Sequence, residues 1–263
     1  MQIGKYKIIR PISEGTFGTV FLGQRIRDKS DVAIKINHHE TFNLIKHECD
    51  VLQYVGNRNV YCVPKVHYYG VHDGLFAMVI PYYEHSLFEA MKMADRKTRL
   101  VYLIQALDAL DHIHSCCVLH RDIKPDNIRI RNHKLIIIDF GLSRFSTNNG
   151  GILPNKRQEN VIGSPMYMSQ MVHRGNRPAM RDDFLSMAFV FAEFTMGQLP
   201  WELHGEFELG IDSDDNIRLA TEKQEFCEEV SGSSGRISII IGYISKLNYA
   251  EYVNTIRLKE FLR

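Results

Sequence analysis

Cysteine is scarce in this chain, and its spacing matches neither disulfide frameworks nor zinc sites. There are five cysteines, an odd number, and no two of them form a Cys-x-x-Cys pair. Such a pattern argues against a disulfide framework and against a zinc site. We therefore expect the protein to work in a reducing compartment.

An excess of charge and long apolar runs are also missing. Lys and Arg number 32 against 31 for Asp and Glu, so composition gives no reason to expect nucleic acid or a membrane surface as the main partner. The richest apolar stretches, near Leu135 and Ile237, are strand-sized or interrupted, and Gly4 is misplaced for myristoylation. We expect a soluble, monomeric protein of the cytoplasm that binds neither nucleic acid nor membrane, with a nuclear location left open.

The length allows two lobes around a cleft. The 263 residues, 44% apolar and 24% charged, are typical of a soluble globular protein with a sizeable core. One large domain and a two-lobed domain both remain open on composition alone.

The most informative stretch is 119–141, which contains His-Arg-Asp-Ile-Lys-Pro-Asp-Asn and then Asp-Phe-Gly. It places Asp122, Lys124 and Asn127 on one loop and Asp139 after an apolar strand. Phosphoryl transfer from magnesium ATP needs an acceptor for the attacking hydroxyl, a cation at the phosphoryl group and two metal ligands, which are Asn127 and Asp139 here. The alternative, a loop of satisfied polar residues beside a buried strand, requires a chance match to both motifs.

A glycine-containing hairpin is expected near the N-terminus. Strands are expected at residues 6–12 and 19–23, and the turn between them at residues 13–18. Gly15 and Gly18 would let backbone N–H groups approach phosphates, and Phe17 would cap the tip of the turn. An ordinary hairpin remains the alternative.

A lysine in an apolar strand points to an ion pair. Residues 31–36 are apolar except for Lys35, and in segment 40–55 Glu48 falls on the apolar face of a predicted helix. Each charge is costly inside the protein unless it is paired. The pattern predicts a Lys35–Glu48 ion pair that directs the ammonium group at the nucleotide, the alternative being two solvated surface charges.

A connector follows the next expected strand, at 75–80. Residues 81–85 lead into a helix near Ser86 and can offer backbone groups to an adenine edge. Pro81 lacks an N–H but keeps its carbonyl, and Tyr83 can still donate its N–H. Ile80 would control access to the rear of the pocket.

The second half of the chain is expected to be mainly helical. Apolar residues at helical spacing predict an amphipathic helix over 100–113, and an almost uniformly apolar run predicts a buried helix over 183–196. Between these helices, the polar segment from 142 to 164 has the character of a long functional loop that frames the acceptor substrate. The acidic segment 201–218 is expected to be a solvated loop.

These motifs together resemble those of the eukaryotic protein kinases over nearly the whole chain. The resemblance rests on Val-Ala-Ile-Lys ending at Lys35, on His-Arg-Asp-Ile-Lys-Pro-Asp-Asn ending at Asn127, and on Asp-Phe-Gly starting at Asp139. Lys124 in its motif is similar to the serine/threonine branch rather than the tyrosine branch.

A finer resemblance is to the casein kinase I family. Gly-Ser-Pro-Met-Tyr-Met-Ser, residues 163–169, stands where most kinases have a Gly-Thr segment leading to Ala-Pro-Glu. Arg-Asp-Asp at 181–183 and Leu-Pro-Trp at 199–201 complete the similarity. It is firm from about residue 4 to residue 201.

The resemblance implies an α+β, two-lobed kinase fold in a single domain covering 1–263. A small antiparallel sheet with one helix would extend to about Tyr82, and residues 83–263 would form a mainly helical lobe. The implied activity is phosphorylation of Ser and Thr in protein substrates with ATP and Mg²⁺. The implied catalytic residues are Asp122, Lys124 and Asn127, with Asn127 and Asp139 as metal ligands. The implied ATP-binding residues are Ile12, Gly15, Gly18, Val20, Ala33, Lys35, Glu48, Ile80, Tyr83 and Asp139.

Three departures from the family are visible. Ser13 replaces the first glycine of the phosphate loop, and residues 221–225 lack the family's basic cluster, so nuclear targeting is not implied. Met166 stands where the family has an arginine that binds a phosphate upstream of the target residue. We therefore expect little preference for such primed substrates, with partial compensation from Lys156, Arg157, Arg218 and Lys223.

Two other functions are alternatives to protein phosphorylation. A catalytically dead nucleotide-binding scaffold is disfavoured because Lys35, Asp122, Asn127 and Asp139 are all present. A small-molecule kinase of related fold is disfavoured by Lys124 and by the substrate-loop segment after residue 163.

Overall fold

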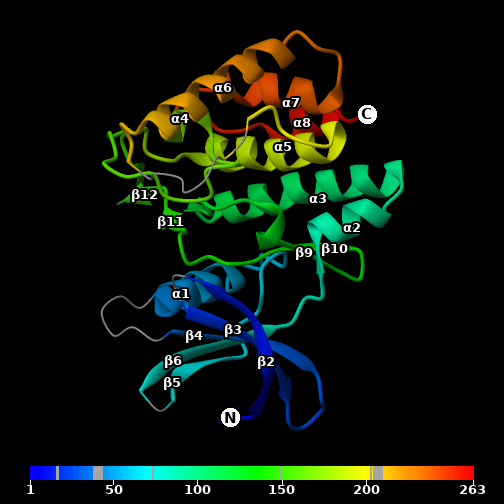
Figure 1. Ribbon diagram of the computed structural model, residues 1–263, viewed down its shortest axis with the longest axis vertical. Coiled ribbons are helices and arrows are strands. Elements are labelled where there is room, and N and C mark those ends of the chain that lie inside the picture. The colour runs from blue at the N-terminus through cyan, green and yellow to red at the C-terminus, as the bar shows by residue number, and fades with distance from the viewer. Residues whose placement is uncertain (16–17, 38–43, 73, 149, 202, 204–209) are drawn as a thin grey trace.

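Two lobes lie one above the other in the computed structural model, which describes residues 1–15, 18–37, 44–72, 74–148, 150–201, 203 and 210–263 (Figure 1). The first lobe is a six-stranded antiparallel sheet with one helix, and the second is mainly helical. This is the predicted two-lobed α+β arrangement.

The sheet of the first lobe has the order β1-β2-β3-β4-β6-β5. Its strands are β1 Gln2–Ile3, β2 Tyr6–Gly15, β3 Gly18–Arg25, β4 Asp31–Asn37, β5 Tyr68–His72 and β6 Leu75–Pro81. Successive side chains of a strand point to opposite faces. In β4, Val32, Ile34 and Ile36 are therefore buried together in a small core, and Lys35 lies on the other face.

Helix α1, Leu44–Gly56, packs against β4 and β6. Glu48 lies on its buried face and is only 2% exposed, as the helical periodicity predicts. The other buried residues of this helix are Ile45, Cys49, Val51, Leu52 and Val55. Residues 40–43 of the predicted helical segment lie outside the described residues.

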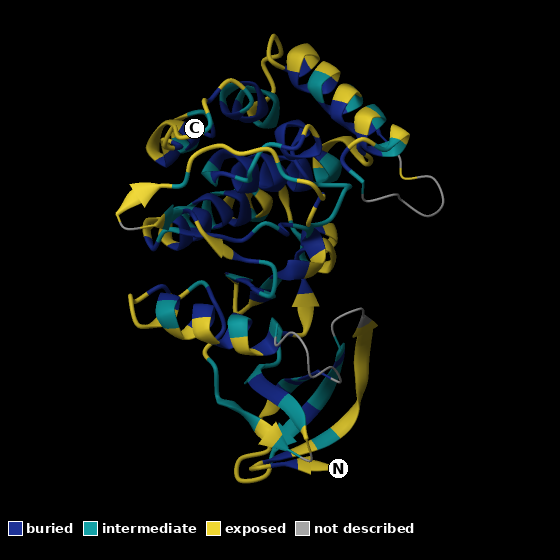
Figure 2. Ribbon diagram, turned by 90° about the vertical axis from the view of Figure 1, so that its left-hand side faces the viewer, coloured by how far each residue is buried: buried dark blue, intermediate teal, exposed yellow. Residues whose placement is uncertain are grey.

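The second lobe is built around two long helices, α3 and α5. Residues 181–192 of α5 are buried throughout, and Figure 2 shows this helix as the dark centre of the lobe. Across the described ranges, no helix is both long and apolar enough to cross a membrane. The helices are α2 Leu87–Met93, α3 Arg96–Ser115, α4 Gln170–His173, α5 Met180–Met196, α6 Asp214–Val230, α7 Arg236–Ile244 and α8 Thr255–Glu260, with a 3₁₀ turn at Pro125–Asn127.

Short strands connect these helices to the cleft. In the described chain β9 pairs with β7 and β10, β8 pairs with β11, and β12 pairs with β13. Their bounds are β7 His85–Ser86, β8 Val118–Leu119, β9 Ile128–Arg131, β10 Lys134–Ile137, β11 Arg144–Phe145, β12 Thr147–Asn148 and β13 Gly151–Ile152.

Two expected boundaries in the first lobe are wrong. Strands β2 and β3 run to Gly15 and from Gly18, so the predicted turn 13–18 is mostly strand. Strand β6 continues through Pro81, which was expected in the connector. Phe17, expected to cap the turn, lies outside the described residues.

The acidic segment 201–218 is not all loop, as was expected. Asp214 and Asp215 form the first turn of α6, and the Ser213 side chain caps the helix by accepting from the Asn216 N–H. Carboxylates are stabilised at a helix N-terminus by the helix dipole. Glu202, Glu206 and Glu208 lie outside the described residues.

Candidate active site

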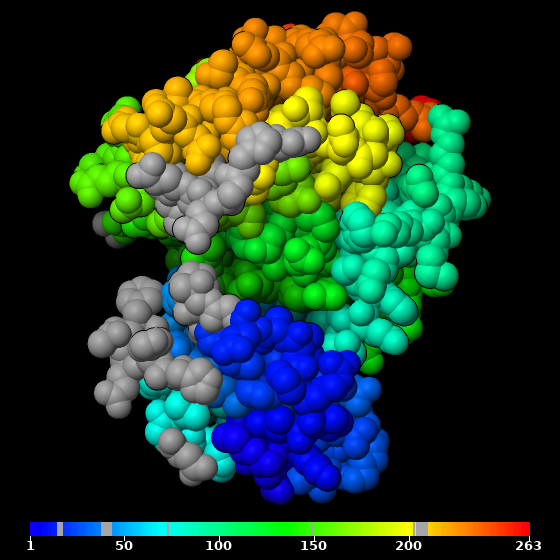
Figure 3. Space-filling view, viewed as in Figure 1, coloured from blue at the N-terminus to red at the C-terminus, as the bar shows by residue number. Residues whose placement is uncertain are grey.

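A cavity of about 550 Å³ lies between the two lobes, a volume typical of ligand sites. Figure 3 shows the blue surface of the sheet lobe facing the green surface of the helical lobe at this level. Most of the predicted site residues line the cavity, namely Ile12, Val20, Ala33, Lys35, Glu48, Ile80, Tyr83, Lys124, Asn127 and Asp139.

The two predicted loop glycines are not part of this lining. Gly15 and Gly18 pair with each other across the hairpin. A Cβ on Gly18 would lie 2.2 Å from the Ile36 carbonyl oxygen, and its φ of +128° is rarely adopted by other residues. Close packing against β4 therefore explains this glycine.

Two apolar residues of the cavity wall were missed by the sequence analysis. Met78 is fully buried and lies two residues before Ile80 in β6, and Ile138 directly precedes Asp139. The period-2 alternation of the strand was a signal for Met78. Together they extend the apolar surface of the pocket.

Lys35 connects the two lobes through ion pairs. Its Nζ lies 2.7 Å from Glu48 Oε2 and 2.8 Å from Asp139 Oδ1. Glu48 Oε1 also accepts a hydrogen bond from the Phe140 backbone N–H at 3.2 Å. The predicted Lys35–Glu48 pair is present, and it also holds the Asp-Phe-Gly motif.

Burial and pairing have opposite effects on this cluster. Burial alone would lower the pKa of Lys35, but the carboxylates of Glu48 and Asp139 raise it above its ordinary value. Burial raises the pKa of Glu48, an effect that Lys35 only partly offsets. For Asp139, burial would raise the pKa, but Lys35 brings it below the ordinary value. The ammonium therefore stays charged where a nucleotide phosphate would need it.

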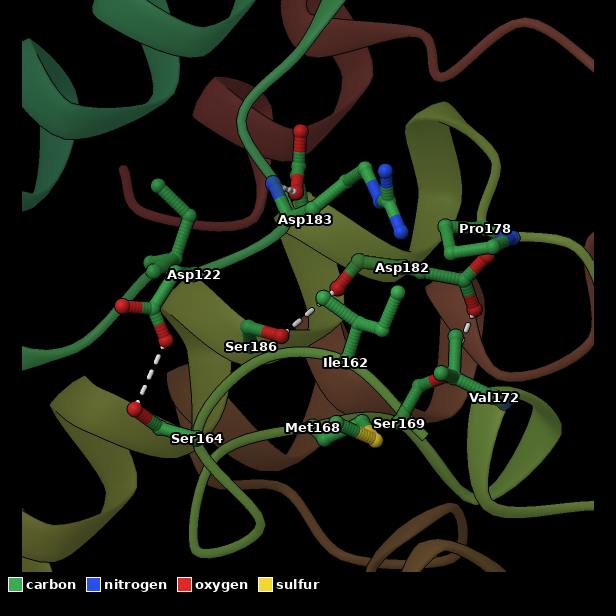
Figure 4. Close-up of a pocket in the computed structure, with 12 residues that line it drawn as sticks. Asp122, Ile162, Ser164, Met168, Ser169, Val172, Pro178, Asp182, Asp183 and Ser186 are labelled. Atoms are coloured by element: carbon green, nitrogen blue, oxygen red, sulfur yellow. Dashed lines mark hydrogen bonds between the residues drawn. The ribbon is translucent and has the colours of Figure 1, made fainter. Parts of the chain in front are cut away.

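Asp122 is the centre of a second cluster, at the start of the helical lobe. Its Oδ1 accepts from Ser164 Oγ at 2.7 Å, and its Oδ2 lies 3.0 Å from Lys124 Nζ. Lys124 Nζ also donates to Ser164 Oγ at 3.0 Å. Asn127 Nδ2 donates to the Asp122 backbone oxygen at 2.8 Å and to its Oδ2 at 3.0 Å. The three predicted catalytic residues are brought together, and Figure 4 shows Ser164, not singled out beforehand, pointing at Asp122 from a separate segment.

Asp183, in the first turn of α5, holds the loop that carries Asp122. Its Oδ2 accepts from the His120 N–H at 2.7 Å and from His114 Nε2 at 2.8 Å, and its Oδ1 accepts from the Arg121 N–H at 2.8 Å. Burial would raise the pKa of Asp183, but these donors, His114 foremost, hold it below its ordinary value. The contacts fix Arg121 at a φ of +71°, which is unfavourable for a side chain of this kind.

His120 joins the two motifs of the site. Its Nε2 lies 3.0 Å from the Ile138 carbonyl oxygen, and its ring packs edge-on against Phe140 with centroids 4.8 Å apart. Asp139, which lies between Ile138 and Phe140 in the chain, has a φ of +65°. His120 thus connects the loop that carries Asp122 to the residues on either side of Asp139.

The oxygens of Asn127 and Asp139 fit a magnesium ion. Asn127 uses its Nδ2 to bind Asp122, which leaves its Oδ1 as an acceptor, and the Asp139 side chain is still 43% exposed. Among the described residues no group of three or more His, Cys, Asp or Glu converges on one point. Mg²⁺ typically uses one or two protein ligands together with phosphate and water, so the donor set suits a metal that arrives with a nucleotide.

Three of the four residues expected to compensate for Met166 are buried or paired with carboxylates. Lys223 is fully buried, so its expected role as a phosphate-binding residue is wrong. Arg157 Nη2 lies 2.7 Å from Asp212 Oδ1, and Arg218 Nη1 lies 3.0 Å from Glu222 Oε1. Lys156 is the fourth residue of that set and is exposed.

Comparison with known protein families agrees with this geometry. The family model of the protein kinase domain matches residues 6–248, which include both lobes, the Lys35 cluster and the Asp122 cluster. The chain therefore belongs to the protein kinase domain family, whose activity is ATP-dependent transfer of a phosphoryl group to proteins.

Proposed function

We propose that the protein is a serine/threonine kinase of the casein kinase I type, which uses ATP and Mg²⁺ to phosphorylate Ser and Thr in protein substrates. One observation carries this proposal: the Lys124 ammonium lies 3.0 Å from both the Asp122 carboxylate and the Ser164 hydroxyl. A fixed cation beside the acid that receives the acceptor's proton would stabilise the charge of the transferred group.

Each residue of the two clusters has a role in this proposal. Asp122 orients the attacking hydroxyl and accepts its hydrogen bond, while Lys124 contacts the transferred phosphoryl group. Lys35 binds the inner phosphates, and the Glu48 carboxylate at 2.7 Å keeps its ammonium in place. Asn127 and Asp139 would hold Mg²⁺, which neutralises phosphate charge when bound.

The adenine would lie against the connector between the lobes. Ile80, Tyr83 and Ala33 line the cavity there together with Ile12 and Val20. Apolar walls of this kind, with a few backbone donors and acceptors, are typical of sites for planar ligands. We propose that the Tyr83 N–H and the Pro81 carbonyl bind the adenine edge.

The casein kinase I type is supported by the segment after Gly163. The chain has no Ala-Pro-Glu there, and Ser169 Oγ instead donates to the buried Asp182 Oδ1 at 2.6 Å. Figure 4 shows the Ser169 and Asp182 side chains beside each other between this segment and α5. We also propose that residues 1–263 act as one monomeric kinase domain with the lobe boundary at about Tyr82.

The test is transfer of radiolabelled phosphate from ATP to casein and to matched peptides that differ only in having Ser, Thr or Tyr as the acceptor. We expect label on casein and on the Ser and Thr peptides, dependence on Mg²⁺, and no label on the Tyr peptide. Asp122→Asn serves as the inactive control.

Each contrary result has a defined meaning. Label on the Tyr peptide would contradict the Ser/Thr assignment, and Ser/Thr labelling without casein labelling would contradict the casein kinase I type. ATP binding without transfer to any acceptor would favour a nucleotide-binding scaffold instead.

A further inference from the structure

The segment that follows Gly163 is held through its backbone carbonyls. The Pro165 and Met168 oxygens accept from Lys223 Nζ, the latter at 2.8 Å, and the Met166 oxygen accepts from Trp201 Nε1 at 2.8 Å. The donors are side chains from distant parts of the chain. The course of this segment therefore depends on a few external hydrogen bonds rather than on a strand or helix of its own.

Lys223 is an unusual donor because no carboxylate among the described residues contacts its ammonium group. It lies on α6, has no exposed surface, and forms no ion pair with any carboxylate in the described part of the chain. Its third contact is His173 Nε2 at 3.0 Å, and its Nζ lies 5.0 Å from the centre of the Trp201 ring. Figure 1 shows α6 lying alongside α4, the helix that ends at His173.

His173 is set up to accept from this lysine. Its Nδ1 lies 2.6 Å from Asn216 Oδ1, and Asn216 Nδ2 in turn donates to the His173 and Ile211 carbonyls. Nε2 lies 3.0 Å from Lys223 Nζ and 3.2 Å from the Pro165 carbonyl oxygen. Because the Asn216 oxygen takes the ring N–H at Nδ1, the lone pair of Nε2 accepts from Lys223. Burial and the neighbouring ammonium lower the pKa of His173 to about 3, consistent with a neutral ring. Three N–H groups of the ammonium thus meet two carbonyls and one ring nitrogen.

The segment held in this way reaches the catalytic cluster directly. Ser164, adjacent to Pro165, makes the contacts of 2.7 Å to Asp122 and 3.0 Å to Lys124. Before it, Gly163 has a φ of +120°, and a Cβ there would lie 2.5 Å from the Arg121 carbonyl oxygen. The segment therefore packs so closely against the catalytic loop that a side chain at position 163 would not fit. A shift of Pro165 would move the adjacent Ser164 away from Asp122.

We propose that Lys223 is a positioning residue for the acceptor side of the site. It fixes the Pro165–Met168 backbone, and through Ser164 it sets where a substrate hydroxyl can approach Asp122. The inference rests on the proposed kinase function. Lys223 does not line the nucleotide cavity, so we expect its influence to fall on the protein substrate and not on ATP.

The test compares three readouts in Lys223→Met: kcat/KM for a Ser peptide, KM for ATP, and ATP hydrolysis without peptide. Met keeps much of the length of the side chain and removes all of its donors. We expect kcat/KM for the peptide to fall at least tenfold, while KM for ATP and ATP hydrolysis change less than threefold. Lys223→Gln, which retains amide donors, should recover part of the peptide activity.

Lys259→Met is the matched control. Lys259, on α8, is paired through its Nζ with Asp108 Oδ1 of α3 at 2.6 Å, and neither residue lines the nucleotide cavity. Removing this charge should leave all three readouts unchanged. If Lys223→Met is not recovered folded, Trp201→Phe, which loses the donor to the Met166 carbonyl, is measured with the same three readouts and the same expected split.

The outcomes separate this inference from the proposed function. If the wild type phosphorylates no Ser peptide, the proposed function fails. If the wild type is active and Lys223→Met matches it, or if peptide transfer and ATP hydrolysis fall by the same factor, the positioning role is overturned.

Discussion

Each side of the cleft contains a lysine removed from most or all of the solvent, Lys35 half-buried and Lys223 fully buried, and their partners differ. Lys35, on the nucleotide side, contacts the carboxylates of Glu48 and Asp139. Lys223, behind the acceptor side, contacts two backbone carbonyls and a ring nitrogen. Burial acts on both, yet the pKa of Lys35 is raised, whereas burial lowers that of Lys223 well below its ordinary value.

The difference shows what each lysine contributes. Carboxylate partners stabilise the charged form of Lys35, so that a full positive charge faces the cavity. Neutral acceptors give Lys223 three directed hydrogen bonds but little compensation for its buried charge. The nucleotide side is therefore organised by charge and the acceptor side by backbone geometry, and the predictions below test that contrast.

The largest effect is expected for Asp122→Asn on the acceptor side. Asn keeps the shape and can still bind Asn127 and Ser164, but it cannot take up a proton from the acceptor hydroxyl. General-base positioning of this kind contributes roughly 10²- to 10⁴-fold, so kcat should fall by about that factor while ATP affinity and the unfolding temperature stay close to wild type. Steady-state kinetics and calorimetry measure these three quantities, and near wild-type turnover would sink the assignment.

On the nucleotide side, Asp139→Ala should weaken binding of ATP in the presence of Mg²⁺. The variant loses one of two proposed metal ligands, and even outer partners of metal ligands affect metal affinity by about 10- to 100-fold. We expect at least a tenfold weaker magnesium-dependent affinity. Titration of wild type and variant with a fluorescent nucleotide, with and without Mg²⁺, measures it, and equal wild-type affinity in the two conditions would contradict the metal role.

The nucleotide side could be predicted from the sequence because its charges interrupt regular patterns. Lys35 is the one charged residue inside an apolar strand, and Glu48 falls on the apolar face of a helix, so each must find a partner. The pairing of Lys35 and Glu48 follows from these two observations together with the family resemblance, and the structure has it at 2.7 Å.

The supports of the acceptor side could not be predicted in the same way. Lys223 lies among Glu222, Gln224 and Glu225, a sequence typical of a solvated helix face, and only the stacking of α6 on the substrate segment buries it. Asp183 was noted as part of a motif, but its three donors come from positions 62 to 69 residues away in the chain. Local periodicity carries no information about such contacts.

The neutral acceptor His173 gives the acceptor side a pH dependence of stability. Its pKa is lowered to about 3 in the folded protein by burial and by Lys223, against an ordinary value of 6.5. As pH falls below 6.5, the His173 imidazole takes up a proton in the unfolded chain but not in the folded protein. The free energy of unfolding therefore decreases as pH falls below 6.5. Between pH 6.5 and pH 5 the loss should be about 1.5 kcal/mol.

Urea unfolding of wild type and His173→Gln at these two pH values measures this contribution. The other titrating groups are common to both proteins, so the difference between their pH slopes isolates His173. Parallel slopes would show that folding leaves the pKa of His173 unchanged, and this would contradict its assignment as a buried, neutral acceptor.

A smaller effect is expected from Met166→Arg on substrate choice. Met166 is half-buried, and two of the cations expected to compensate for it, Arg157 and Arg218, are paired with carboxylates. A thioether offers neither the charge nor the forked donors that bind phosphate. The wild type should therefore show little preference for a peptide with phosphoserine three residues before the target, and the variant should gain a preference of about tenfold, the lower end of what one charge-assisted contact contributes.

The ratio of kcat/KM for the primed and unprimed forms of one serine peptide measures this preference in both proteins. Met166→Leu, which adds no charge, is the matched control. A large preference in the wild type that Met166→Arg leaves unchanged would mean that phosphate is recognised by other residues.

The smallest effect is expected from removing phosphate from the loop after Gly141, because the loop is held by contacts that need none. His47 Nε2, on α1, lies 2.8 Å from the Ser143 carbonyl oxygen, and the Ser143 hydroxyl donates to the Phe140 carbonyl at 2.6 Å. The Ser146 hydroxyl donates to the Cys117 carbonyl at 3.2 Å. Both serines are buried, so phosphorylating either one would first require these hydrogen bonds to break.

We therefore expect protein from bacteria to phosphorylate casein at the same rate, within about twofold, before and after phosphatase treatment, with mass spectrometry confirming that phosphate is absent. A requirement for phosphate would need a cationic site to receive it. Arg121 is available for that role, since burial and the charge of Arg144 lower its pKa and an added anion would relieve their repulsion. If phosphatase treatment abolished activity, the loop would be held by a phosphate bound to Arg121 and Arg144 and not by its own hydrogen bonds. The acceptor side would then depend on charge, as the nucleotide side does.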